Sequence, residues 1–118
     1  MAIGIPGVDE AIFNDLFDGD DDLFKTVLTT FVEKTPISLA KLANPTKETL
    51  EDYRILVHAV KGACANICAE DLRKKAFDLE MKAKAGDLAG VQAGNDPFIK
   101  EMEGMIEKSK GWLKNRQE

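Results

Sequence analysis

Apolar residues recur every three or four positions through most of the chain, which is the spacing of side chains along one face of an α-helix. The alternation of apolar and polar residues that marks a half-buried strand is absent. One continuous stripe runs through residues 50–67, and similar stripes run through 24–42, 72–83 and 98–113. The members of the continuous stripe are Leu50, Tyr53, Val57, Val60, Cys64 and Ile67. The pattern predicts an all-α protein.

The expected helix boundaries follow from the acidic, proline and capping residues between the stripes. A short first helix is expected over residues 9–17. The stretch Asp20–Asp22 suits the start of a second helix, because carboxylates near an N-terminus accept free backbone N–H groups and favour the helix dipole. Pro36 is expected to kink or interrupt that helix. Thr46 or Asn44 is expected to cap the third helix.

The second half of the chain contains signals for two more helices. A turn at residues 66–68 should lead into a fourth helix, which should end near Gly86 because glycine terminates helices readily. After a short helical piece, Asp96 as N-cap and Pro97 as first helical residue should open the last helix. Four long amphipathic helices with short connections predict an antiparallel up-down four-helix bundle, which the short N-terminal helix caps at one end. The 118 residues suit a single domain, 1–118.

Composition narrows the classes of function. The formal net charge of −5 argues against a nucleic-acid partner, because phosphate backbones require a basic surface. No apolar run approaches the roughly 20 residues of a membrane span, and residues 1–7 lack the basic and apolar parts of a secretory signal. We therefore expect a cytoplasmic protein without a membrane partner. Two cysteines make a disulfide framework improbable.

The only histidine lies on the polar side of the stripe through residues 50–67. His58, Lys61, Gly62 and Ala65 have the spacing i, i+3, i+4 and i+7, so they share one helix face. Ile55 also falls on this outer side. With the stripe turned inward, the helix pitch places His58 roughly 135° from the stripe centre. These five residues are the candidate site, and the sequence predicts that they are exposed.

Each residue of this face suits phosphoryl chemistry. An exposed neutral imidazole is a nucleophile, and a lysine ammonium one turn away can bind a phosphoryl oxygen. A glycine in a helix interior costs about 1 kcal/mol relative to alanine, which is understandable at Gly62 if another protein approaches there. Taken singly, His58 and Lys61 would be ordinary surface residues, and Gly62 would mark a kink or a packing contact. The combination His-x-x-Lys-Gly favours a functional site with His58 as candidate nucleophile and Lys61 as a cation suited to a phosphoryl oxygen. Ile55, Gly62 and Ala65 are the candidate docking residues beside them.

Other groups of residues are weaker candidates for a functional site. Cys64, Cys68 and His58 could suggest a metal site, but Cys64 belongs to the buried stripe and His58 points outward, so we expect no metal and two buried free thiols. The basic cluster Arg73–Lys75 is most simply a solvated face, and the alternative is that it attracts an acidic partner. The chain lacks a glycine-rich phosphate loop, so we expect no ATP-dependent kinase activity of its own.

The segment His58–Leu72, HAVKGACANICAEDL, resembles the signature region of the histidine phosphotransfer family of two-component phosphorelays. Leu79-Glu80 and the stretch 83–87 are similar to the family's next helix and its exit, and the resemblance covers roughly residues 5–113. It implies a four-helix bundle with His58 as phosphoacceptor, Lys61 as phosphate-side cation and Gly62 as the clearance residue. One departure concerns Cys68, where members usually have glycine. If that turn requires a positive φ, either Cys68 is strained or the turn differs.

By this resemblance, the chain is expected to be a phosphorelay carrier. His58, by resemblance through Nε2, accepts a phosphoryl group from the aspartyl phosphate of a response-regulator receiver domain and passes it to another receiver. A sensor or hybrid histidine kinase belongs to the same system. No cofactor is expected on this chain, any Mg²⁺ belongs to the receiver, and the chain is expected to be a monomer. The alternative is a helical module that docks a receiver or another signalling protein without being phosphorylated.

Overall fold

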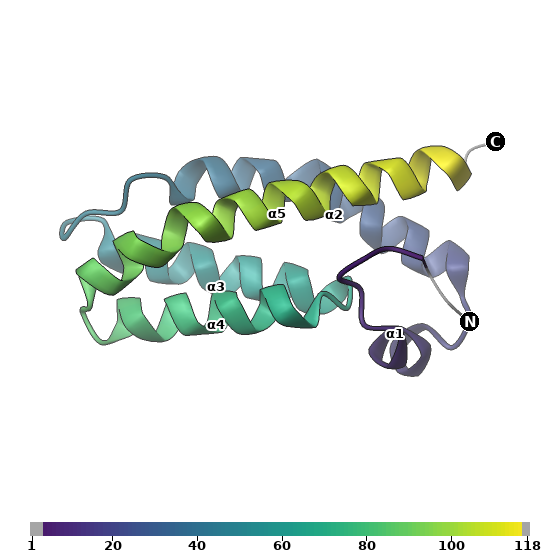
Figure 1. Cartoon of the computed structure of the whole chain (residues 1–118), viewed down its shortest axis with the longest axis horizontal. Coiled ribbons are helices and arrows are strands. Elements are labelled where there is room, and N and C mark those ends of the chain that lie inside the picture. Colours follow the sequence, from purple (N-terminus) through teal and green to yellow (C-terminus); the bar gives the residue numbers. More distant parts are fainter. Residues whose placement is uncertain (1–3, 117–118) are drawn as a thin grey trace.

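The computed structural model describes residues 4–116, and within them every regular element is a helix. Figure 1 shows four long helices lying side by side along the longest axis of the molecule, with a short helix at one end. The helices are α1 (Glu10–Phe17), α2 (Asp21–Leu42), α3 (Leu50–Asn66), α4 (Glu70–Lys84) and α5 (Leu88–Arg116). The prediction of an all-α chain is confirmed. No helix in this range is both long and apolar enough to cross a membrane; residues 1–3, part of the segment considered for a secretory signal, lie outside it.

The core is formed by the apolar stripes of the four long helices. α3 packs against α2 and α4, and α5 packs against the other sides of α2 and α4. On α3 the stripe residues are buried, apart from Leu50 at its first turn, which is half-buried. A buried amide also joins three helices: Asn95 donates to the carbonyl of Leu42 at 2.8 Å and accepts from the Tyr53 hydroxyl at 2.9 Å. The predicted stripes therefore identify the core.

The N-terminal segment is fixed to the end of the long helices by capping and aromatic packing. Asp9 accepts a hydrogen bond from the backbone N–H of Ile12 at 3.0 Å and starts α1. Asp20 accepts from the N–H of Leu23 at 2.9 Å and starts α2, as the acidic stretch predicted. The ring of Phe24 lies edge-on to those of Phe13, Phe17 and Trp112, with centroids 4.9, 5.0 and 5.7 Å away.

The middle of the chain differs from the prediction at the start of α3, and in part at Pro36. Of the two outcomes expected at Pro36, an interruption is excluded, because Pro36 lies inside the continuous helix α2. Neither Asn44 nor Thr46 caps α3, because that helix begins later, at Leu50, and its N-cap Thr49 makes no side-chain capping bond. Thr46 bonds to Thr49 instead: the Thr49 hydroxyl accepts from the Thr46 N–H at 2.9 Å, and the Thr46 hydroxyl accepts from the Thr49 N–H at 3.2 Å. The two threonines close a turn of their own before the helix starts.

The last helix also begins earlier than predicted. Asp96 and Pro97 do not open a helix, since α5 runs without a break from Leu88 to Arg116 with Pro97 inside it. An interior proline costs about 3 kcal/mol because it removes a hydrogen bond and crowds the preceding turn. The buried Asn95 just before Pro97 and the buried Phe98 just after it hold this segment against the other helices. Tertiary packing therefore outweighs the local signal for a helix start.

The turn between α3 and α4 contains Cys68, the residue at which the chain departs from the family that it resembles. Cys68 has φ = 62°, so a residue with a side chain occupies a left-handed conformation that favours glycine. Its N–H donates to the carbonyl of Ala65 at 3.1 Å, and its carbonyl accepts from the N–H of Asp9 at 2.8 Å. The turn therefore has a positive φ and Cys68 is the strained residue. The end of α4 was predicted correctly, with Gly86 at φ = 78°.

Candidate functional site

The predicted face of α3 is open to solvent around its histidine. The His58 side chain is 62% exposed, and Gly62, one turn further, is exposed as well. Ile55 is also exposed, whereas Ala65 and Lys61 are half-buried. The predicted exposure is therefore confirmed for His58, Gly62 and Ile55, whereas Lys61 and Ala65 are less exposed than predicted.

A glutamate on the neighbouring helix joins the histidine to the lysine. Nδ1 of His58 lies 2.7 Å from Oε2 of Glu80, and Nζ of Lys61 lies 2.7 Å from Oε1 of the same carboxylate. Glu80 is 6% exposed. Its buried Oε1 accepts no well-directed hydrogen bond, so its contact with Lys61 is an ion pair that depends on charge and distance. One buried carboxylate thus contacts both candidate functional groups.

The ionisation of Glu80 fixes the roles of the two imidazole nitrogens. Burial disfavours the charged carboxyl, but the contacts with Lys61 and His58 outweigh that effect, and the pKa of Glu80 is lowered. An ionised carboxylate can only accept hydrogen bonds, so Nδ1 of His58 must donate. In the neutral ring the other nitrogen, Nε2, then carries the free lone pair. Glu80 thereby leaves Nε2 as the nucleophilic atom.

The lysine contacts a second residue of α4. Nζ of Lys61 lies 5.2 Å from the centroid of the Phe77 ring, within the range of a cation–π interaction. Phe77 precedes Glu80 by three positions, so both side chains leave the same side of α4. The Lys61 side chain is only 21% exposed because it lies against this side of the helix.

The structure leaves Gly62 without an internal packing role. A Cβ atom added at this position would have no heavy atom within 4 Å outside its immediate helical surroundings. Nothing inside the molecule therefore requires glycine here. The missing side chain therefore leaves open space on the surface one helical turn from His58.

The two cysteines lie away from this face. Cys64 and Cys68 are buried free thiols, and Cys64 donates to the sulfur of Met102 at 3.6 Å. Burial raises the pKa of the Cys64 thiol to about 12. Burial, together with the nearby Asp9 carboxylate, raises that of Cys68 to about 11. Both are therefore protonated packing residues at neutral pH. Across residues 4–116, no three His, Cys, Asp or Glu side chains are grouped so as to hold a metal ion.

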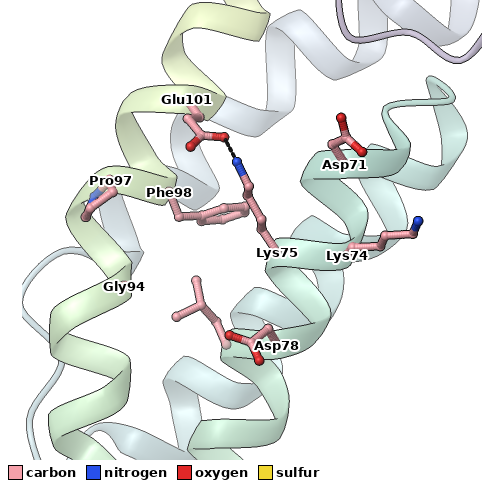
Figure 2. Close-up of a pocket in the computed structure, with 9 residues that line it drawn as sticks. Asp71, Lys74, Lys75, Asp78, Gly94, Pro97, Phe98 and Glu101 are labelled. Atoms are coloured by element: carbon pink, nitrogen blue, oxygen red, sulfur yellow. Dashed lines mark hydrogen bonds and ion pairs between the residues drawn. The ribbon is translucent and has the colours of Figure 1, made fainter.

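A groove between α4 and α5 lies beside the basic cluster (Figure 2). Lys75 reaches across it to Glu101 on α5, with the charged atoms 2.6 Å apart. Arg73 is paired with Glu70 in its own helix. Two of the three basic side chains are therefore neutralised within the molecule, and Asp71 adds negative charge to the same groove. This arrangement favours an ordinary solvated surface over an attractive basic patch.

Glu80 was the functional candidate that the sequence analysis did not assign. One signal was present: residues 72, 76, 79 and 83 form the apolar stripe of the fourth helix, and an acid at position 80 falls on the same side. Buried acids are rare unless they are paired. The identity of its partners depends on how α3 and α4 pack, which helical spacing within one element does not provide.

Comparison of the sequence with protein-family models and with curated proteins finds no match, and comparison of the fold with solved structures finds none either. The function is therefore inferred from the geometry around His58, Lys61 and Glu80 and from the resemblance of residues 58–72.

Proposed function

We propose that this chain is a histidine phosphotransfer domain, an antiparallel up-down four-helix bundle capped by α1, whose His58 carries a phosphoryl group between receiver domains. The observation that carries the proposal is the contact of the exposed His58 with the buried, ionised carboxylate of Glu80 at 2.7 Å. That contact orients the ring and leaves Nε2 free. An ordinary surface histidine has no need of a buried carboxylate on a neighbouring helix.

The proposed reaction is an in-line displacement at phosphorus. The lone pair of Nε2 attacks the phosphorus of the receiver's aspartyl phosphate, an N–P bond forms, and the P–O bond to the aspartate breaks. The aspartate leaves as a carboxylate with the bonding electron pair, and the proton on Nδ1 stays in place. The reverse transfer regenerates neutral His58 and a new aspartyl phosphate. Such a step depends mainly on positioning and on neutralising charge.

Glu80 and Lys61 supply complementary charges for this step. The imidazole ring becomes positive as the N–P bond forms, and the Glu80 carboxylate that accepts from Nδ1 stabilises that charge. The ammonium of Lys61 is next to the same carboxylate and can turn to a phosphoryl oxygen, where negative charge accumulates. Any Mg²⁺ and the attacked aspartyl phosphate belong to the receiver in this proposal.

The surface around His58 suits the approach of a folded partner. Gly62 leaves open space one turn from the histidine, and Ile55 offers an exposed apolar side chain one turn on the other side. Ala65 adds a small side chain further along α3. We assign these three residues to contact with the receiver, and we place the relay, with its sensor or hybrid histidine kinase, in the cytoplasm.

The experiment that tests the proposal is transfer from phosphorylated receiver domains encoded by the same genome. The purified chain should acquire a phosphate that is stable to alkali and lost in acid, and mass spectrometry should locate it on His58. His58→Gln is the control and should fold normally without accepting phosphate. Receiver binding without phosphate on His58 would support the non-phosphorylated docking module instead, and phosphate retained by His58→Gln would overturn the assignment.

A further inference from the structure

Phe77 is a large apolar residue that is only partly buried. Its side chain is 46% exposed, while the neighbouring stripe residues Ala76 and Leu79 are buried. Its ring is nevertheless in contact with a charge, because Nζ of Lys61 lies 5.2 Å from its centroid. The negative face of an aromatic ring attracts a nearby cation such as a lysine ammonium. The contact with Lys61 therefore explains why a phenylalanine is found at this partly exposed position.

Two residues of α4, Glu80 and Phe77, contact the Lys61 ammonium. The Glu80 carboxylate is buried and the Phe77 ring is partly exposed, so the two contacts lie at different depths. A free lysine side chain samples many rotamers, and restricting it before the reaction removes an entropic cost from the reaction itself. The contact with Glu80 alone would hold the Lys61 ammonium at a buried carboxylate oxygen. The Phe77 ring gives the same ammonium a second contact nearer the surface.

We propose that Phe77 is a positioning residue that keeps the Lys61 ammonium at the surface beside His58, ready to exchange the Glu80 carboxylate for a phosphoryl oxygen. This inference rests on the proposed phosphotransfer function. Phe77 makes and breaks no bond: the N–P bond forms at His58 and the broken bond belongs to the donor. The prediction is that the ring face of Phe77, rather than its bulk, assists transfer, and that it does so only through Lys61.

The contact can be measured without any phosphorylation. Protons above an aromatic ring face resonate upfield, so in the wild-type chain the side-chain methylene protons of Lys61 nearest Nζ should be shifted upfield in the NMR spectrum. Phe77→Leu should abolish the shift and Phe77→Tyr should preserve it. Ile37→Ala, which removes an exposed apolar side chain on α2, should leave it unchanged. A wild-type spectrum without the shift would overturn the proposal.

The effect on transfer is best measured with phosphoramidate, a small donor that needs no protein docking. Its P–N bond breaks and ammonia leaves as the N–P bond to His58 forms. Phe77→Leu should slow phosphorylation about two- to fivefold, the size expected for one partly exposed cation–π contact. Phe77→Tyr and Ile37→Ala should react at the wild-type rate. In a Lys61→Met background, Phe77→Leu should cause no further loss.

The results of these experiments distinguish a failure of the proposed phosphotransfer function from a failure of the proposed role of Phe77. If wild-type His58 accepts phosphate from neither phosphoramidate nor any receiver, the proposed function falls and the role of Phe77 falls with it. If the wild type is phosphorylated but Phe77→Leu reacts normally, the function stands and Phe77 has no role. An equal loss for Phe77→Tyr, or an equal loss in the Lys61→Met background, would also overturn the positioning role, because bulk or folding would then explain the effect.

Discussion

The buried carboxylate of Glu80 and the exposed imidazole of His58 are 2.7 Å apart, although they lie on different helices and are separated by 22 positions in the sequence. The contact joins a group that is protected from water to one that faces it. Because the carboxylate also contacts Lys61, a change at Glu80 should affect both the nucleophile and the cation.

Glu80→Gln should slow phosphorylation of His58 without abolishing it. A glutamine of the same length can still accept from Nδ1, but it lacks the charge that stabilises the ring as it becomes positive. A hydrogen bond to a charged group contributes about 1.5–3 kcal/mol, so the rate should fall roughly 10- to 100-fold. The measurement is the initial rate with phosphoramidate and with a phosphorylated receiver. Equal rates for Glu80→Gln and the wild type would show that Glu80 has only a structural role.

The stability that Glu80 provides should depend on pH in the acid range. Its pKa is lowered from the ordinary value of 4.5 in the folded chain. Its ionisation therefore stabilises the fold fully above that value, and this contribution is lost as the pH falls through the lower folded pKa. The difference in unfolding free energy between the wild type and Glu80→Gln should therefore shrink as the pH falls below about 4. Urea titrations at several pH values would measure it, and a difference that does not shrink in this acid range would contradict the assigned direction.

Lys61→Met should slow transfer in a chain that still folds, with a loss of stability because the buried Glu80 carboxylate loses its ion pair. Methionine keeps an unbranched apolar stem against Phe77 and removes the ammonium that is expected to bind the phosphoryl oxygen. Loss of one such charge contact should reduce the rate roughly tenfold, because the lysine is not the nucleophile. Lys74→Met is the control, since Lys74 is an exposed lysine on α4 in the groove away from His58. Equal effects of the two substitutions would indicate loss of general surface charge.

Gly62→Gln should separate stability from docking. A side chain at this position meets open space, and replacing a mid-helix glycine by a good helix former should stabilise the chain by up to about 1 kcal/mol. The same side chain would stand where a receiver must approach His58. The melting temperature should therefore hold or rise, transfer from a receiver should fall sharply, and phosphorylation by phosphoramidate should persist. A stable variant with normal receiver transfer would remove Gly62 from the docking surface.

Cys68→Gly and Cys68→Ala should differ in stability although both remove the same buried thiol. Cys68 has φ = 62°, a conformation that costs about 1–2 kcal/mol for a residue with a Cβ atom and little for glycine. Cys68→Gly should therefore be more stable than Cys68→Ala by about 1 kcal/mol. Thermal or urea unfolding of the two variants would measure the difference. A less stable glycine variant would mean that the turn carries no such strain.

Most of the secondary structure was predictable from the sequence because helices are local. Spacing of three and four positions identified the buried faces of the long helices, and the aspartates at 9 and 20 marked the first two starts. The same spacing placed His58 and Gly62 on the exposed side of α3. These properties depend on residues within a few turns of each other, whose relative directions are fixed by the helix itself.

The tertiary structure decided what the local pattern could not. Pro97 was expected to begin a helix, yet it lies inside α5, where the buried Asn95 bonds to residues of α2 and α3. Glu80 acquired its role only because α4 packs beside α3 and brings its carboxylate to His58 and Lys61. The sequence alone determined which face of α3 carries the candidate chemistry. The packing of α4 determined which partners complete it, because contacts between helices depend on distances that periodicity within one helix does not contain.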